Sequence, residues 1–258
     1  GLPDMSFSDA VAAGANSVVI GVAPSGGALK AEWVSVLAEA MRSGLSLISG
    51  LHRKLSEESE LVKAAAASGQ QLIDIRVPPA SISIATGRRR SGKRLLMVGT
   101  DCCVGKKYSA LSLHKALKER GIAATFRATG QTGILIAGRG IPMDAVVSDF
   151  LSGAAETLTP DAATDHWDVI EGQGSLFHPA YAAVTLGLLH GSQPDAMVLC
   201  HGVGRMVIDE YEDYPVPDLR DCVAQYEQAA RVTNRVSSIV GISLNTQGLS
   251  DDEAVRAC

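Results

Sequence analysis

The chain has 258 residues, of which 46% are hydrophobic and 20% are charged. This composition is typical of a globular protein with one large domain or two small ones. The formal net charge of -5 argues against nucleic acid as the main partner. The apolar stretch at 180–189 is too short to cross a bilayer, and no secretory leader is visible, so we expect no membrane partner. The five cysteines show neither metal-ligand spacing nor a paired framework, which favours a reducing, cytoplasmic location.

The first part of the chain alternates predicted strands with predicted helices. Strands are expected at 17–23, 45–49 and 72–76, helices at 31–43 and 58–67, and a loop at 24–27. This order indicates a small parallel-sheet domain. The basic stretch 86–93, TGRRRSGK, has the composition of a linker; a solvated segment is the favoured explanation and a phosphate contact the alternative. We therefore place one domain at 1–90 and a second at 91–258.

The second domain opens with an apolar strand at 95–98, the loop GTDCCVGKKY and a helix at 109–117. Strand, glycine-bounded loop with a Gly-Lys pair and helix form the layout of a phosphate-binding loop. Backbone N–H groups and the helix dipole favour an anion there. The alternative is an ordinary strand-to-helix turn. The predicted ligand-binding residues of the loop are Gly99, Thr100, Cys102, Cys103, Val104, Gly105, Lys106, Lys107 and Tyr108.

One position of this loop departs from the usual pattern. A Ser or Thr normally follows the Gly-Lys pair, and its hydroxyl binds magnesium. Here that residue is Lys107. Two adjacent cations without a hydroxyl suit a polyanion better than a magnesium–triphosphate centre. We therefore expect phosphate binding that requires no metal.

Further strands are predicted at 123–128, 167–170, 196–201 and 239–245, with helices at 145–157 and 251–258. Ligand sites of open α/β sheets gather at the carboxyl ends of the strands. That rule collects Asp101, Lys106, Arg127, Thr129, Gln131, Glu171, His201 and Asn245 near one crevice.

Several of these side chains have two explanations. Glu171, at a strand tip, suits a magnesium ligand or a group that positions a nucleophile; the less favoured alternative is a helix cap or a structural ion pair. Arg127 and Arg205 can each grip a carboxylate or lie on the surface. His178 offers imidazole chemistry, although most histidines are structural. Asn245 suits either a base edge or a turn.

The loop cysteines, Cys102 and Cys103, sit where a helix N-terminus lowers the pKa of a thiol. Covalent carriage of an acyl group by one of them is conceivable. Small side chains that fit a tight loop are the favoured explanation.

The motifs support two resemblances. GTDCCVGKKY resembles the phosphate loop of dethiobiotin synthetase-like ATPases. The loop of those enzymes consists of GTD, three variable residues and GKT. The turn Ile170-Glu171-Gly172 resembles their metal-binding turn, and Asn245-Thr246 resembles their base-reading asparagine. Lys107 stands in place of their threonine, which argues against ATP and magnesium.

The second resemblance spans nearly the whole chain. Its motifs are SGLH at 49–52, GTDCCVGK at 99–106, ATGQTGILIAGRG at 128–140, DHWDVIEGQGSLFHP at 165–179 and LGLLHGSQPDA at 186–196. They resemble the D-glutamate N-acetyltransferase family. The resemblance implies an α/β protein with a Rossmann-like N-terminal domain followed by a P-loop NTPase-like domain. It also implies transfer of an acetyl group from acetyl-CoA to the amine of D-glutamate.

This activity assigns expected roles to the candidate residues. The catalytic candidates are Glu171, His178 and Asp101, with Glu171 or His178 as the base. Acetyl-CoA is expected on the loop and Asn245. The substrate-binding candidates are Arg127, Thr129, Gln131, Ser175, His201 and Arg205. We expect small-molecule partners and a homo-oligomer. The alternatives are an ATP- and magnesium-dependent ligase or kinase acting on a small carboxylic acid, and a non-catalytic nucleotide-binding protein.

Overall fold

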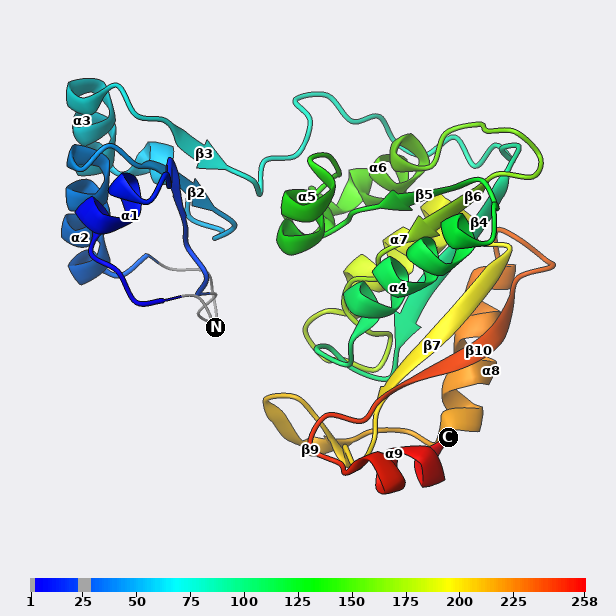
Figure 1. Cartoon of the computed structure of the whole chain (residues 1–258). Helices are drawn as coiled ribbons and strands as arrows, with labels where there is room; N and C mark the ends of the chain where they lie inside the picture. Colours follow the sequence, from blue (N-terminus) through cyan, green and yellow to red (C-terminus); the bar gives the residue numbers. More distant parts are fainter. Residues whose placement is uncertain (1–2, 23–28) are drawn as a thin grey trace. The chain divides into compact units, whose positions relative to one another are not determined.

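The structure is a computed structural model that describes residues 3–22 and 29–258 (Figure 1). The chain divides into two compact units, Gly1–Val77 and Pro78–Cys258. The loop predicted at 24–27 and the end of the first predicted strand lie outside the described residues. None of the helices in the described ranges is long and apolar enough to cross a membrane.

The first unit is built on a parallel three-stranded sheet in the order β1-β2-β3. Its strands are β1 (Ser17–Val19), β2 (Ser46–Ser49) and β3 (Leu72–Asp74), and its helices are α1 (Phe7–Ala12), α2 (Ala31–Arg42), η2 (Leu55–Glu57) and α3 (Ser59–Ser68). Helix α2 buries Leu37 and Met41 against Leu47 of β2. The predicted alternation is confirmed, with strands shorter than expected and with α1 unanticipated.

The second unit contains a parallel five-stranded sheet in the order β10-β7-β4-β6-β5. These strands are β4 (Lys93–Gly99), β5 (Ala124–Arg127), β6 (Trp167–Ile170), β7 (Ala196–Gly202) and β10 (Ser238–Asn245). The helices are α4 (Lys106–Glu119), α5 (Gln131–Ala137), η3 (Met143–Ala145), η4 (Ser148–Phe150), α6 (Leu151–Leu158), α7 (Ala182–Ser192), α8 (Leu219–Arg231) and α9 (Asp251–Ala257). A short antiparallel pair, β8 (Val207–Ile208) and β9 (Tyr211–Pro215), was not anticipated.

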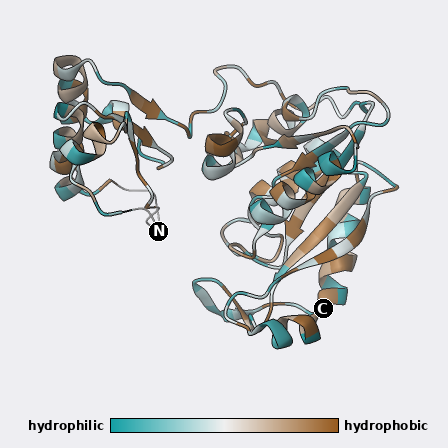
Figure 2. Cartoon of the chain, in the orientation of Figure 1, coloured by the Kyte–Doolittle hydropathy of each residue, from teal (hydrophilic) through white to brown (hydrophobic). Residues whose placement is uncertain are grey.

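Successive side chains of β4 point to opposite faces of the sheet, which explains why this unit has a hydrophobic core on each side of the sheet. Leu96 and Val98 join the core that contains residues of α6, α7 and α8, whereas Leu95 and Met97 join the opposite core beneath α4. Both faces of the central strand are thus covered, which explains its continuous apolar sequence. Figure 2 shows that the strands of this sheet are mostly hydrophobic. The chain extends the sheet on one side of β4 and then on the other, so a switch point lies at the carboxyl end of β4.

The domain boundary differs from the predicted one after residue 90, because residues 78–90 belong to the second unit. The backbone N–H groups of Thr86 and Gly87 donate to the Glu156 carboxylate at 2.7 and 2.9 Å. Arg90 is buried, and its guanidinium donates to the carbonyls of Thr159 and Gly191 at 2.6 and 2.7 Å. Arg90 of the basic stretch is therefore a structural anchor rather than part of a solvated linker.

Candidate functional site

A cavity of about 750 Å³ opens at the carboxyl ends of the strands of the second unit. Four segments line it: 102–109 after β4, 130–132 after β5, 171–174 after β6 and 243–247 at the end of β10. The cavity therefore lies at the switch point that the topology marks. The predicted crevice is present, with Lys106, Gln131, Glu171 and Asn245 among its lining residues.

The phosphate loop joins β4 to α4 at one wall of the cavity. Gly105 precedes α4 with a φ of 100°, a left-handed conformation that favours glycine. Lys106 follows as the first residue of α4, so the free N–H groups of the first helical turn meet the cavity there. The Lys106 ammonium is buried and donates to the Asp101 carbonyl at 2.7 Å, and burial lowers its pKa. This arrangement fits an anion at the loop.

Glu171 enters the cavity directly after β6. Its Oε2 accepts the backbone N–H groups of Thr129 and Gly130, at 2.9 and 3.1 Å, at the start of α5. A β carbon at Gly133 would lie 2.1 Å from this oxygen, so only glycine fits beside it. Oε2 therefore holds the turn that precedes α5 (Gln131–Ala137), and among the described residues it forms neither a side-chain cap of that helix nor an ion pair.

The second carboxylate oxygen of Glu171, Oε1, has a different environment. Among the described residues no hydrogen bond to Oε1 is present, and the atom is not one of the buried polar atoms that lack a partner. Because Glu171 lines the cavity, Oε1 is the oxygen that meets the cavity space. Burial raises the pKa of Glu171, while the two N–H bonds and the nearby Lys107 ammonium oppose that rise. A raised pKa suits a proton acceptor near neutral pH.

The two arginines predicted to grip the substrate are engaged elsewhere. Arg127 donates from Nε to the buried Asp168 carboxylate at 2.7 Å, and Arg205 donates to Asp101 Oδ2 at 2.7 Å. Neither arginine lines the cavity. Each guanidinium compensates a carboxylate that would otherwise be buried without a counter-charge. The geometry therefore does not favour either residue as a substrate clamp.

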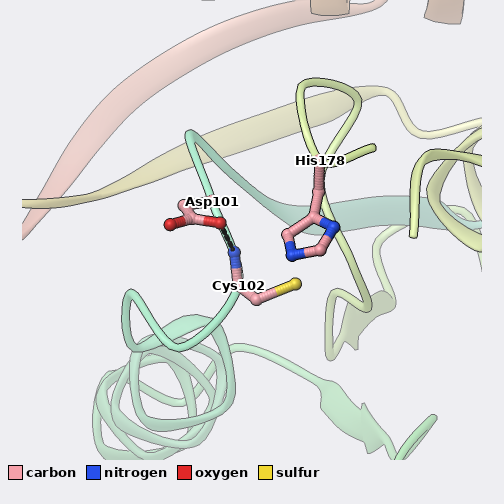
Figure 3. Close-up of side chains that lie close together, drawn as sticks. All are labelled: Asp101, Cys102 and His178. Atoms are coloured by element: carbon pink, nitrogen blue, oxygen red, sulfur yellow. Dashed lines mark hydrogen bonds between the residues drawn. The ribbon is translucent and has the colours of Figure 1, made fainter. Parts of the chain in front are cut away.

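Asp101, Cys102 and His178 form a cluster beside the loop, in which the three side chains approach one another (Figure 3). One ligand-capable atom from each lies within 4.8 Å of the others. Asp101 Oδ1 accepts from the Cys102 N–H at 2.6 Å, and Oδ2 accepts from Arg205 and from the Asp209 N–H. Both oxygens of the carboxylate are therefore hydrogen-bonded within the protein.

Without a metal ion, the His178 ring nitrogen near Cys102 and the Cys102 thiol both carry protons. His178 Nδ1 accepts from the Ala180 N–H at 3.2 Å, so the proton of the neutral ring is on Nε2. Nε2 is the ring nitrogen that faces Cys102 (Figure 3). A protonated nitrogen cannot bind a metal or accept a proton. Burial also raises the pKa of the Cys102 thiol to about 11, so the thiol is protonated at neutral pH when no metal is bound.

The other predicted residues divide between the cavity and its supports. Gln131 and Asn245 line the cavity. Thr129 is buried and its hydroxyl donates to the Glu171 carbonyl at 2.8 Å. Ser175 donates to the Gly99 carbonyl at 2.8 Å, and His201 Nδ1 lies 3.0 Å from the Thr100 hydroxyl. Thr129, Ser175 and His201 therefore hold the loops around the cavity.

Tyr226 is a supporting residue that the sequence did not reveal. Its buried hydroxyl donates to the Gly99 carbonyl at 2.7 Å and accepts from the Leu176 N–H at 3.1 Å. It thereby ties the start of the phosphate loop to the segment after Glu171. Helical spacing places Tyr226 on the apolar face of α8, but that signal does not disclose the partner of its hydroxyl.

Comparison with known proteins identifies relatives of the whole chain. Residues 1–78 match the Rossmann-like domain, and residues 83–258 the P-loop domain, of a family described as a domain of unknown function, DUF1611. A protein of Tritonibacter scottomollicae named D-glutamate N-acetyltransferase is 51% identical over 255 residues, which cover 99% of this chain and 77% of the relative. A protein of Pseudoalteromonas sp with the same name is 48% identical over 258 residues, which cover 100% of this chain and 78% of the relative.

A solved structure agrees with these matches. The crystal structure of a DUF1611 family protein from Anabaena variabilis has a TM-score of 0.90 and 37% sequence identity. The similarity covers 98% of this chain and 74% of that one. The fold class and the family resemblance predicted from the sequence are confirmed. The chain belongs to the DUF1611 family, with a Rossmann-like N-terminal domain and a P-loop C-terminal domain.

Proposed function

We propose that the protein transfers the acetyl group of acetyl-CoA to the amine of D-glutamate. The similarity to two relatives that carry the name D-glutamate N-acetyltransferase supports this activity. The observation that carries the proposal in the structure is one cavity lined by both a phosphate loop and Glu171, whose Oε1 has no hydrogen bond from the described residues. The first of these elements suits an anionic donor, and the second suits deprotonation of an acceptor.

The donor is proposed to bind on the phosphate loop. Acetyl-CoA carries a pyrophosphate and a further phosphate, and the loop offers the first-turn N–H groups of α4 with the ammonium groups of Lys106 and Lys107. Tyr108 and Asn245 line the same cavity and offer a ring face and an amide for the adenine. The two lysines supply charge without any metal.

The acceptor is proposed to react beside Glu171. Oε1 accepts a proton from the D-glutamate ammonium, and the neutral amine then attacks the thioester carbonyl. The new N–C bond forms, the C–S bond breaks, and the CoA thiolate leaves with a proton that the amine nitrogen releases. His178 is not retained as the base, because its acceptor nitrogen is occupied by the Ala180 N–H. Arg127 and Arg205 are not retained as clamps, because both pair with buried carboxylates.

The test is incubation of the full chain with acetyl-CoA and a panel of D- and L-amino acids. Release of free thiol and the mass of the product are followed, with and without a chelator. We expect N-acetyl-D-glutamate at the same rate in both conditions. ATP hydrolysis that depends on magnesium, with no acetyl product, would instead support the ligase or kinase. Tight binding of acetyl-CoA without turnover of any amino acid would support a non-catalytic protein.

A further inference from the structure

The positions that hold magnesium in P-loop nucleotidases are occupied here by residues of different chemistry. In that fold, the hydroxyl after the loop lysine and an acidic residue at the end of a sheet strand hold the metal. Strand β6 pairs directly with β4, so Lys107 and Glu171 occupy the corresponding places in this chain. Both side chains line the cavity.

These residues do not fit a magnesium ion. Lys107 supplies an ammonium, a donor without lone pairs, where the metal needs an oxygen ligand. Glu171 Oε2 is already occupied by two backbone N–H groups, at 2.9 and 3.1 Å. Among the described residues that line the cavity, Glu171 is the only carboxylate. A divalent cation would therefore meet one free carboxylate oxygen and a positive charge.

The surroundings of Lys107 show how its charge is held. Its Nζ lies 4.6 Å from the centre of the Tyr108 ring, within cation–π range, and its side chain is partly buried. At an exposed ring such as Tyr108 this contact is only a weak attraction for the ammonium, and it leaves N–H donors of the ammonium available. The charge therefore remains able to donate to phosphate oxygens in the cavity.

We infer that the Lys107 ammonium replaces the metal ion of the P-loop site, so that Lys107 selects a polyanionic donor that binds without magnesium over a magnesium–nucleotide. This inference rests on the proposed function for the identity of the donor. A cation tethered to the chain does not depend on the supply of a metal ion. The consequence is a phosphate loop whose affinity for CoA phosphates is independent of magnesium.

The experiment measures the affinity of free CoA and of ATP for the full chain by calorimetry, in chelator and in excess magnesium. The series contains the natural protein and the variants Lys107→Thr, Lys107→Met and Lys107→Arg. Lys115→Met is the matched control, because Lys115 lies on the same helix, is exposed and forms a surface ion pair with Glu119. Thermal unfolding of each variant establishes that it is folded.

For the natural protein, Lys107→Arg and Lys115→Met, we expect the same CoA affinity in chelator and in magnesium. In chelator, Lys107→Thr and Lys107→Met should bind CoA about tenfold more weakly, the scale of one charged hydrogen bond. Magnesium should strengthen the binding of CoA and ATP by Lys107→Thr only, because threonine restores the missing hydroxyl.

Three results would overturn the inference. They are loss of CoA binding by the natural protein in chelator, unchanged affinity in Lys107→Met, and equal magnesium dependence in Lys107→Thr and Lys107→Met. The acetylation assay on the natural protein is independent of this binding series. Failure of that assay would remove the proposed function, while the binding series would still decide the role of Lys107.

Discussion

Two groups of polar residues flank the phosphate loop, and they differ in what their hydrogen bonds leave available. The cavity pair, Lys107 and Glu171, lines the cavity and retains one carboxylate oxygen that no described residue hydrogen-bonds. The interior cluster, Asp101, Cys102 and His178, contains the residue types of a nucleophilic triad. Its carboxylate and its acceptor nitrogen are both committed to protein partners.

The comparison shows that the type of a residue predicts a catalytic role only where its polar group still has a free hydrogen-bonding position. Asp101 is fully buried, and three donors from Cys102, Arg205 and Asp209 satisfy it. Such a group stabilises the loop, and most of its acceptor capacity is used within the protein. Glu171 is also buried, yet its hydrogen bonds converge on a single oxygen. The following substitutions test whether catalysis belongs to the cavity pair and support to the interior cluster.

The largest effect is expected for Glu171→Gln. The glutamine carbonyl can still accept the N–H groups of Thr129 and Gly130, so the start of α5 should remain in place. The amide that replaces Oε1 cannot accept a proton. We expect kcat to fall by about 10²–10⁴-fold, the typical contribution of a general base, with little change in the KM for acetyl-CoA. Glu119→Gln on the surface of α4 is the matched control.

The pH profile sharpens this prediction. A base acts when it is deprotonated, so activity should fall as the pH drops through the pKa of Glu171. Burial raises that pKa above the ordinary glutamate value of 4.5, which moves the acidic limb of kcat/KM toward neutrality. The limb should disappear from the residual activity of Glu171→Gln. Near-normal turnover in this variant, with the acidic limb intact, would remove Glu171 from the reacting centre.

The interior cluster should respond through stability. Arg205→Met leaves the buried Asp101 carboxylate without its ion pair, although the N–H groups of Cys102 and Asp209 remain. Because Arg205 is 28% exposed, we expect a loss of about 2–4 kcal/mol in the free energy of unfolding, below the full range for a buried pair. Urea unfolding measures this loss. A folded variant of unchanged stability that binds D-glutamate much more weakly would restore Arg205 as a substrate clamp.

Lys106→Ala tests the residue that lies between the cavity pair and the interior cluster. The Lys106 ammonium is adjacent to both groups, since it lines the cavity and donates to the Asp101 carbonyl. We expect acetyl-CoA to bind more weakly by about 1–3 kcal/mol, the scale of a charged hydrogen bond. Calorimetry with acetyl-CoA measures the change, and Lys115→Ala is the control on the exposed part of the helix. Unchanged affinity would remove the loop from the donor site.

The sequence was sufficient to locate the cavity, because the carboxyl ends of parallel strands meet at one edge of a sheet. Lys106, Gln131, Glu171 and Asn245 each follow or end a strand, and all four line the cavity. The order of apolar segments was likewise enough to predict both parallel sheets. Local pattern therefore determined which strand ends approach the site, although the same rule also named four residues that do not line the cavity: Asp101, Arg127, Thr129 and His201.

The hydrogen-bond and ion-pair partners of the candidate residues depend on the register between neighbouring strands. The local sequence pattern does not determine that register. Arg127 pairs with Ile170 across the sheet, so Asp168 becomes its diagonal neighbour on the same face and captures its guanidinium. The Asp101–Arg205 pair is also formed between segments distant in sequence. The position of the domain boundary was missed for the same reason, because the carbonyls that hold Arg90 come from the ends of α6 and α7.

The smallest effect is expected for Cys102→Ser, although a cysteine beside a histidine and an aspartate resembles a nucleophile. Burial raises the pKa of the Cys102 thiol to about 11, so the thiolate is scarce at neutral pH. His178 cannot take the thiol proton, because the Ala180 N–H occupies Nδ1 and the proton of the neutral ring is on Nε2.

These contacts favour direct transfer of the acetyl group to the amine in the proposed reaction, without an acetyl-cysteine. We expect Cys102→Ser to keep turnover within about threefold of the natural protein, since neither a covalent step nor a charge is removed. Mass spectrometry of the natural protein mixed with acetyl-CoA alone should show no acetylated chain. Cys103→Ser, at the neighbouring exposed cysteine, is the control. An acetylated Cys102 together with a loss of turnover above about 100-fold would transfer catalysis from the cavity pair to the interior cluster.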